Sequence, residues 1–412
     1  MKMKKKRIIP FICIVLVFTA FQAWGQTQAG QGNIKLGPVE VHPSVGLMET
    51  FTDNVYRNYD GRDKKSDWIT TLSPGLELVL PMRRHSFRIG YLADINWYAD
   101  LRENNYVSQA ATGSLNFDFP GGLLFTVSDR FLDSEIVRKA EEQPGLSGAA
   151  DPYRALPFRS NDFLTRAKYS FADRWAAALW YNYYKYGYDH EYDRTGDFDR
   201  NLFGGTLFYR FTPKTDLLVE YTHSKVDYPK SSFDNNKNDT AYVGIGFDPS
   251  AKINGFLKVG WTQKKYDANN AGGERKFSAF STQIDLSYNL SPYDVISLKG
   301  SRTIEEDVDT NAAYTRDNYS LGYTHILSMN EKISLFGLIG YGKSKFEGAS
   351  LDADGALKTR DENIYSATVG VGYAMRRWLT WNLSYTYQET DSNFIRYDYK
   401  ENRVFLRATF SF

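Results

Sequence analysis

The chain has 412 residues, of which 42% are hydrophobic, 24% are charged and 16% are aromatic, and its formal net charge is +1. With a mean hydropathy of −0.48, it is too polar for a bundle of transmembrane helices. Its 50 basic and 49 acidic residues are spread along the chain, without a basic block after the first residues, so there is no electrostatic case for binding nucleic acid.

The amino terminus has the three parts of a secretory signal peptide. Five basic residues lie within residues 2–7, an apolar run follows at 8–20, and Ala23-Trp24-Gly25 is a small-x-small cleavage sequence. The apolar run is shorter than the roughly 20 residues that a spanning helix needs. We therefore expect a signal peptide at 1–25, a short periplasmic segment at 26–42 and a transmembrane barrel at 43–412.

The chain offers few residues for metal or covalent chemistry. The single cysteine, Cys13, lies in the signal peptide, so the mature chain has no thiol for a disulfide or a metal. No two of the five histidines have metal-binding spacing on one strand face. Asp189-His190-Glu191 resembles an acid/base cluster, but a solvated charged loop is the simpler interpretation. We expect no catalytic residues, no metal and no cofactor.

Apolar and polar residues alternate, in segments of ten or more residues, from about Val45 to the end of the chain. At 379–388, for example, Leu, Trp, Leu, Tyr and Tyr alternate with Thr, Asn, Ser, Thr and Gln. Strands of soluble sandwiches are usually about five or six residues long, whereas tilted membrane strands need about nine to eleven. The pattern predicts an all-β fold, an antiparallel up-and-down transmembrane β-barrel.

Short and long connections alternate between these segments, which is typical of short periplasmic turns and longer external loops. The short connections are expected at 82–85, 120–122, 172–174, 212–215, 249–254, 291–294, 328–332 and 375–377. The longer ones are expected at 58–66, 102–105, 135–161, 189–199, 229–238, 267–275, 307–313, 348–361 and 391–398. They separate about eighteen strands, with sixteen as the alternative because the first, at 44–56, alternates poorly.

The end of the chain and its longest loop suggest two further features. Residues 404–412 alternate up to the terminal Phe412, like the carboxy-terminal strand that the barrel-assembly machinery recognises. The third external loop, at 135–161, is long enough to be functional. It either folds inward and narrows the pore or remains a mobile external loop.

The apolar phase of each strand is expected to face lipid, because an Arg or Lys at the bilayer midplane costs about 2 to 4 kcal/mol. The opposite phase then lines a lumen too wide for side chains to fill. Its small basic excess favours either anion passage or neutralising ladders between strands. The charged residues expected in the lumen are Arg88, Asp94, Arg166, Lys168, Arg210, Glu220, Lys258, Asp285, Lys299 and Arg407, together with Glu77, Asp118 and Arg130.

The beginning of the predicted barrel resembles a known family. Residues 43–47 (PSVGL), 49–56 (ETFTDNVY), 66–70 (SDWIT) and 73–76 (SPGL) resemble the opening of outer-membrane β-barrel porins associated with exopolysaccharide gene clusters. The resemblance is sharpest over residues 43–100. It implies a porin-like protein, a conduit for a secreted polysaccharide being one such role, and it carries no catalytic motif.

These observations favour a channel in the outer membrane that passes small solutes or exports a polysaccharide. Inward-phase Tyr98, Trp180, Tyr184 and Phe208 are candidates for stacking on sugar rings, the alternative being ordinary wall residues. Residues 26–42 are too few for an adaptor domain, so export would need separate periplasmic partners. A structural or adhesive barrel, or a barrel enzyme, remains the alternative.

Overall fold

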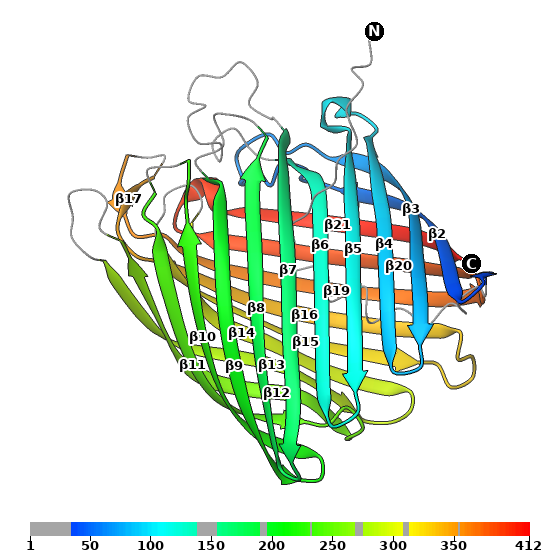
Figure 1. Cartoon of the computed structure of the whole chain (residues 1–412). Coiled ribbons are helices and arrows are strands. Elements are labelled where there is room, and N and C mark those ends of the chain that lie inside the picture. Colours follow the sequence, from blue (N-terminus) through cyan, green and yellow to red (C-terminus); the bar gives the residue numbers. More distant parts are fainter. Residues whose placement is uncertain are drawn as a thin grey trace.

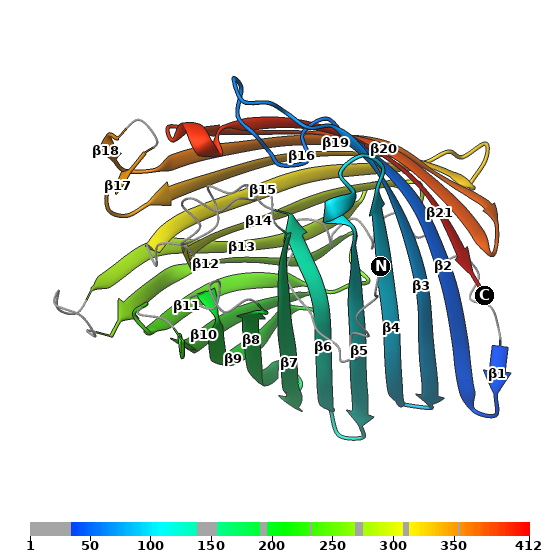
Figure 2. The same ribbon diagram turned by 90° about the horizontal axis from the view of Figure 1, so that it is seen from above.

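The computed structural model describes residues 34–137, 155–189, 196–230, 233–267, 275–307, 313–352 and 355–412. In these residues one antiparallel sheet curves round into a barrel (Figures 1 and 2). The barrel closes where the first long strand, β2 (Val39–Thr52), pairs with the last, β21 (Tyr399–Ser411), in a register that runs from Ser44↔Ser411 to Thr52↔Arg403.

The sheet has nineteen strands, one of which is the three-residue β1 (Ile34–Leu36), paired with β2. The other eighteen form the wall, as the sequence predicted. Between β2 and β21 these strands are β3 (Asp67–Met82), β4 (His85–Tyr98), β5 (Tyr106–Phe119), β6 (Leu123–Val137), β7 (Ala155–Ala172), β8 (Trp175–Tyr188), β9 (Phe198–Thr212), β10 (Thr215–Asp227), β11 (Asn236–Phe247), β12 (Ile253–Tyr266), β13 (Lys276–Asn289), β14 (Asp294–Glu306), β15 (Ala313–Ile326), β16 (Ile333–Phe346), β19 (Asp361–Arg376) and β20 (Leu379–Ser392).

The remaining elements are short. Strands β17 (Ser350–Leu351) and β18 (Leu357–Lys358) form a small ladder in the β16–β19 connection, and single 3₁₀ turns lie at η1 (Arg102–Asn104) and η4 (Ile395–Tyr397). Among the described residues, no helix is long and apolar enough to cross a membrane.

Each expected turn and loop lies between two consecutive wall strands, but the bounds of the first strand, expected at 44–56 and found at Val39–Thr52, and those of the longest loop differ from the prediction. The first wall strand begins at Val39, before the expected start of the barrel at 43, because residues 40–43 pair with β3. The expected loop at 135–161 is shorter, because β6 and β7 remain paired up to Val137↔Ala155. Inward Leu156 and Phe158 pack there against the Tyr184 and Tyr186 rings. The proposed constriction falls mostly on residues 138–154, outside the described residues.

The register fixes which side chains face lipid. Cross-strand rows on the outer face consist of apolar residues such as Val219, Val243 and Val259, which are 59%, 56% and 39% exposed on the isolated chain. Residues of the opposite phase, which carries the charges, therefore point into the barrel.

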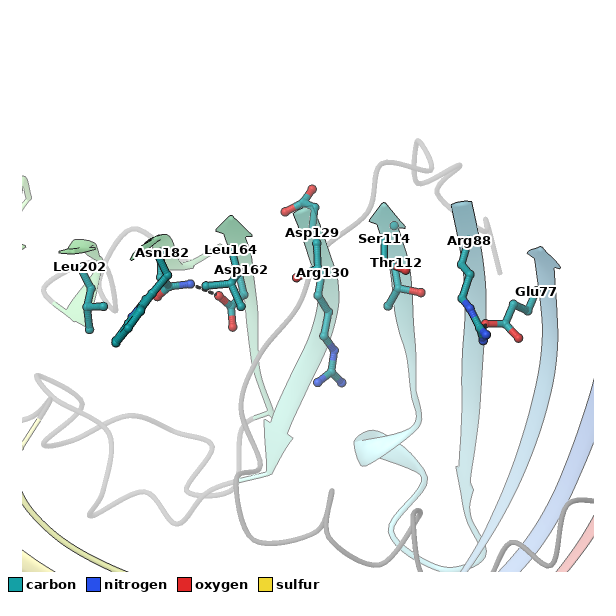
Figure 3. A pocket seen from close by; sticks show the side chains of 13 residues that line it. Glu77, Arg88, Thr112, Ser114, Asp129, Arg130, Asp162, Leu164, Asn182 and Leu202 are labelled. Carbon is teal, nitrogen blue, oxygen red and sulfur yellow. Dashed lines mark hydrogen bonds and ion pairs between the residues drawn. The ribbon is translucent and has the colours of Figure 1, made fainter. Parts of the chain in front are cut away.

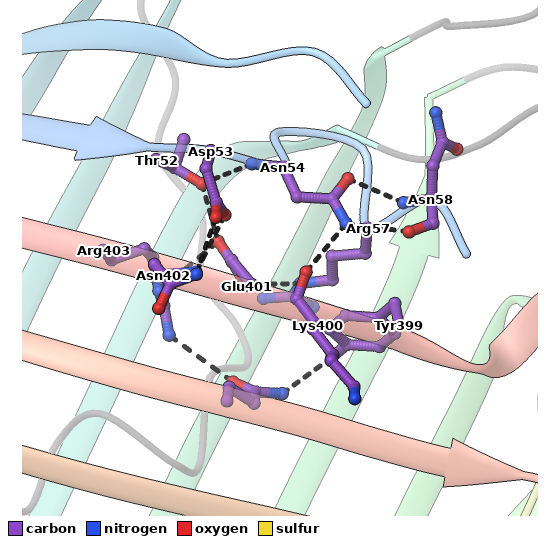
Figure 4. A network of polar contacts seen from close by, with 11 residues as sticks. Thr52, Asp53, Asn54, Arg57, Asn58, Tyr399, Lys400, Glu401, Asn402 and Arg403 are labelled. Atoms are coloured by element: carbon purple, nitrogen blue, oxygen red, sulfur yellow. Dashed lines mark hydrogen bonds and ion pairs between the residues drawn. The ribbon is translucent and has the colours of Figure 1, made fainter. Parts of the chain in front are cut away.

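The first external loop is bound to the last strand across the closing seam (Figure 4). Asn54 and Asn58 are fully buried, and the Asn54 side-chain amide donates to the Asn58 and Lys400 carbonyls at 2.8 and 2.9 Å. Arg57 approaches Glu401 at 3.4 Å, and its guanidinium lies 5.7 Å from the Tyr399 ring. These contacts hold the external mouth together where the first and last strands meet.

Candidate functional site in the barrel lumen

Strands β7, β8 and β9 place two cations beside two aromatic rings on the inner face of the wall. Arg166 of β7 is opposite Trp180 of β8, which is opposite Gly204 of β9. One row nearer the periplasmic end, Lys168 is opposite Ala178. One row beyond that, Ala176 is opposite Phe208. We call Arg166, Lys168, Trp180 and Phe208 the basic-aromatic wall.

The absence of a side chain at Gly204 leaves room for the Trp180 ring against the wall. A Cβ atom added to Gly204 would lie 2.1 Å from Cε2 of the indole, so the ring rests against the glycine backbone. Any larger residue at 204 would have to push the ring off the wall. The Arg166 guanidinium lies 5.6 Å from the centroid of the Trp180 ring, within the range of a cation–π contact.

Lys168 and Phe208 form the second pair. The Lys168 ammonium lies 4.6 Å from the centroid of the Phe208 ring, and the small side chains of Ala176 and Ala178 separate the two on β8. Among the described residues, neither Arg166 nor Lys168 has a carboxylate within ion-pair distance. The basic-aromatic wall therefore presents positive charge that its described neighbours do not neutralise.

Most other predicted lumen charges are in the inward phase but are neutralised by a neighbour. Ion pairs join Arg88 to Glu77 at 3.7 Å, Arg210 to Asp216 at 3.1 Å, Lys299 to Asp285 at 3.4 Å and Lys258 to Glu220 at 2.9 Å. The sequence left anion passage and neutralising ladders open, and three of these four pairs join neighbouring strands as such ladders do.

The Lys258–Glu220 pair joins strands that are not adjacent. Glu220 lies on β10 opposite Tyr242 of β11, and Lys258 lies on β12 opposite Gly244 of β11, so the pair crosses β11 diagonally. A Cβ on Gly244 would come within 3.0 Å of the Lys258 Cγ, so the glycine makes room for the lysine to reach across. The two side chains are only 12% and 9% exposed, and Thr206 also donates to Glu220 at 2.9 Å. This ion pair is therefore mostly buried against the wall and is little exposed to the lumen.

Four other predicted lumen charges have different surroundings. Asp94 accepts a hydrogen bond from Ser73 at 2.6 Å, and Asp118 lies 3.2 Å from Arg84 at the periplasmic end. The Arg407 guanidinium lies beside Gly46, where a Cβ would be 3.2 Å away. Arg130 points into the lumen in Figure 3.

The four aromatic candidates for sugar stacking divide into two groups. Trp180 and Phe208 are partly exposed on the lumen side. Tyr98 and Tyr184 are only 8% and 4% exposed, and Tyr184 is covered by Leu156, Phe158 and Tyr186. The alternation of the strands placed all four rings in the inward phase but did not show that two of them are buried.

A hollow of about 490 Å³ lies in the wall next to Trp180 (Figure 3). Polar side chains of six strands line it: Glu77, Arg88, Thr112, Ser114, Ser128, Arg130, Asp162 and Asn182. The Asn182 amide donates to Asp162, and Arg200 donates to the Asn182 oxygen at 3.2 Å.

Asn182 and Asp162 were not among the sequence candidates. Asn182 shares the inward phase of Trp180 and could have been found by that phase, but it has no charge. Asp162 adjoins the expected loop at 135–161, whose last residues, 155–161, belong to β7. In the described part of the chain, no group of three or more His, Asp or Glu side chains is arranged to hold a metal ion.

The carboxy-terminal part of the barrel matches a known family. Residues 209–412 match the family model described as "Putative beta-barrel porin 2". No curated protein matches the sequence.

Several solved structures are similar to the chain. Pseudomonas aeruginosa OccK2 (OpdF), in complex with glucuronate, is 10% identical with a TM-score of 0.49, covering 90% of this chain and 98% of that chain. Acinetobacter baumannii OccAB3 is 12% identical with a TM-score of 0.47, covering 92% and 100%. Pseudomonas aeruginosa OpdK, with vanillate, is 10% identical with a TM-score of 0.49, covering 90% and 99%. At this level of similarity, the ligands of those proteins say nothing about this one.

The closed eighteen-stranded wall, its apolar outer face and its charged inner face agree with the family match and indicate a channel rather than an enzyme. Residues 209–412 match the family putative beta-barrel porin 2, and the protein is a porin-like channel of the outer membrane.

Proposed function

We propose that this channel passes saccharides that carry acidic groups, and that the basic-aromatic wall is the surface they contact. The observation that carries the proposal is the pairing of Arg166 with Trp180 and of Lys168 with Phe208 on one side of the lumen. Rings of this kind pack against the C–H faces of sugars, and the adjacent cations suit a carboxylate or another acidic substituent.

The position of these residues also supports the proposal. The two pairs lie in neighbouring rows of the wall, and a chain of sugars could touch both. The nearby hollow adds hydroxyl, amide and carboxylate groups that can exchange hydrogen bonds with sugar hydroxyls. Neutral solutes small enough for the lumen would pass without using this wall.

Small acidic sugars and a secreted acidic polysaccharide would use the same wall. The polysaccharide role further requires periplasmic export components as partners. Both roles require export of the chain with its signal peptide removed and insertion by the barrel-assembly machinery, for which the strand ending at Phe412 is the expected recognition element.

Swelling of liposomes that contain the purified channel tests passage. We expect a hexuronate to enter the liposomes faster, relative to a neutral hexose, than its size alone predicts. The R166Q/K168Q variant should lose that advantage. The matched control is K299Q/D285N, which also changes two lumen residues but leaves the net charge unchanged. Equal entry of the two sugars through the wild-type channel would refute the preference for acidic sugars, and no entry of any sugar would favour a structural or adhesive barrel.

Secretion in a strain that lacks the protein separates the two roles. If the channel exports a polymer, secretion falls in the deletion strain, returns with the wild-type gene and returns only partly with R166Q/K168Q. Normal secretion without the protein would leave diffusion of small acidic sugars as its role.

A further inference from the structure

Four lysines form one cross-strand row on the outer surface of β10–β13. Lys225 is directly opposite Lys237, Lys237 is opposite Lys265, and Lys265 is opposite Lys276. All four are in the lipid-facing phase, at the strand ends that lead into the connections at 228–235 and 267–275. These are longer connections, so the row lies at the external end of the barrel. We call it the lysine row.

Such a row costs stability, because like charges directly opposite each other on neighbouring strands repel. Outward-facing lysines elsewhere at this end follow the opposite rule. Each of the following lies directly opposite a carboxylate: Lys185 opposite Asp199, Lys343 opposite Asp317, Lys345 opposite Asp361 and Lys400 opposite Glu389. The lysine row departs from this rule on four adjacent strands.

Nearby acids neutralise only part of the row. Asp227 lies 2.7 Å from Lys225, and Asp267 lies 3.5 Å from Lys237. Among the described residues, Lys265 and Lys276 have no ion-pair partner. One row below, Asp239 accepts from Tyr221 and contacts His223, so its carboxylate is already engaged.

The rows below show where the lysine row lies in the membrane. The row of Leu217, Ile245, Leu257 and Ile284 is apolar, and two rows further out are Tyr221, Trp261 and Phe280, which are 54%, 54% and 49% exposed. Exposed aromatic residues of this kind mark the edge of the hydrocarbon layer. The lysine row is two rows beyond them, which is about 13 Å along the strand and, at a tilt near 45°, about 9 Å along the membrane normal.

That is the depth of the headgroups in the external leaflet, and we propose that the lysine row binds the phosphates of phosphorylated glycolipids there. The lysine ammonium is a compact point charge that suits phosphate. Four lysines spaced by about 4.8 Å form a strip some 14 Å long, enough for more than one phosphate. The exposed aromatic row beneath would contact the acyl chains of the same lipid, which free phosphate or a soluble acidic protein could not use.

Lipid binding to the purified protein tests this. In a neutral maltoside detergent, native mass spectrometry would count the molecules of diphosphoryl lipid A that remain bound. The dephosphorylated form of the same lipid is the comparison ligand, because it lacks the phosphates. We expect the wild type to retain the diphosphoryl form selectively. K225Q/K237Q/K265Q/K276Q should weaken this binding by about tenfold or more, since each cation near an anionic surface contributes to attraction. The matched control is K185Q/K343Q/K345Q/K400Q, which removes four outward lysines that lie opposite acids and should change binding by less than about twofold.

Stability without lipid provides an independent measurement. In the neutral detergent the row variant should unfold at the same or a higher temperature than the wild type, because repulsion is removed, whereas the control variant should unfold at a lower one. K265Q/K276Q, which removes the two lysines without ion pairs, should give part of the loss of binding.

Three results would overturn the proposal: unchanged lipid binding by the row variant, an equal loss in the control variant, or equal binding of the dephosphorylated lipid. If millimolar inorganic phosphate raised the unfolding temperature of the wild type as much as the lipid does, the assignment to a lipid headgroup would be overturned. None of these measurements depends on what passes through the lumen.

Discussion

Replacing Arg166 and Lys168 by glutamine should reduce the preference of the channel for anions. An ion about 6 Å from one of these charges in water has an interaction energy of about 0.7 kcal/mol. Screening at 0.1 M salt, where the Debye length is about 10 Å, lowers this to about 0.4 kcal/mol, or about twofold in local anion concentration per charge. Two charges give about fourfold beside the wall, and cations are depleted by a similar factor. Because the lumen of an eighteen-stranded barrel is wide, the average over its cross-section is smaller. We expect the anion-to-cation permeability ratio to fall about two- to fivefold.

Reversal potentials in planar bilayers across a gradient of KCl measure this ratio. At about 1 M salt the Debye length is near 3 Å, so the difference between R166Q/K168Q and the wild type should almost vanish. K299Q/D285N, which removes a neutral ion pair from the same lumen, should behave like the wild type at both salt concentrations. An unchanged ratio in R166Q/K168Q at low salt, or a difference that persists at 1 M, would refute the assignment of free positive charge to this wall.

Three further predictions concern the inner face, the closing seam and the outer face of the barrel. Gly204→Ala should displace the Trp180 ring, cost about 1 to 3 kcal/mol through overpacking and slow hexuronate entry, whereas Gly205→Ala, which meets a flexible leucine side chain on the opposite face, should leave entry unchanged in liposome swelling. Asn54→Ala should lower the free energy of unfolding in urea by about 1 to 3 kcal/mol, because buried partners lose their hydrogen bonds; an unchanged midpoint would contradict the role of this residue in the seam. Val243→Arg should cost about 2 to 4 kcal/mol if that position lies near the midplane, and a change below 1 kcal/mol in vesicles would argue against a lipid-facing position.

The sequence was sufficient to predict the barrel because the same alternation of apolar and polar residues recurs in strand after strand. Period-two alternation gives the side chains of each strand two faces, and the energetic penalty for charge in lipid determines which face points outward. Arg166, Lys168 and Trp180 could therefore be placed on the inner face without any knowledge of their neighbours. The same argument works less well for a strand with a poor pattern such as β2, whose start was placed several residues late because alternation weakens around Pro43.

The partners of these residues could not be predicted from the sequence, because they depend on the register between strands. A shift of two residues keeps every side chain on its face but changes every cross-strand neighbour. The Lys258–Glu220 pair further depends on a glycine in the strand between them. The burial of Tyr184 could not be predicted for a similar reason, because Leu156, Phe158 and Tyr186, whose contacts alternation does not describe, pack against its ring.

Register also explains why a net charge of +1 conceals two cationic surfaces. Many basic residues of the described wall lie opposite a carboxylate, whereas the basic-aromatic wall on the inner face and the lysine row on the outer face each bring neighbouring cations together without one directly opposite. Both adjoin exposed aromatic rings, but they point to opposite sides of the sheet and lie on different strands. Charges this far apart, with salt water on the inner side, should be nearly independent, so combining R166Q/K168Q with the lysine-row substitutions should give additive changes in ion selectivity and lipid binding. Coupling of more than about 0.5 kcal/mol between them would mean that the lipid at the rim changes the shape of the wall, and the two sites would then have to be treated as one.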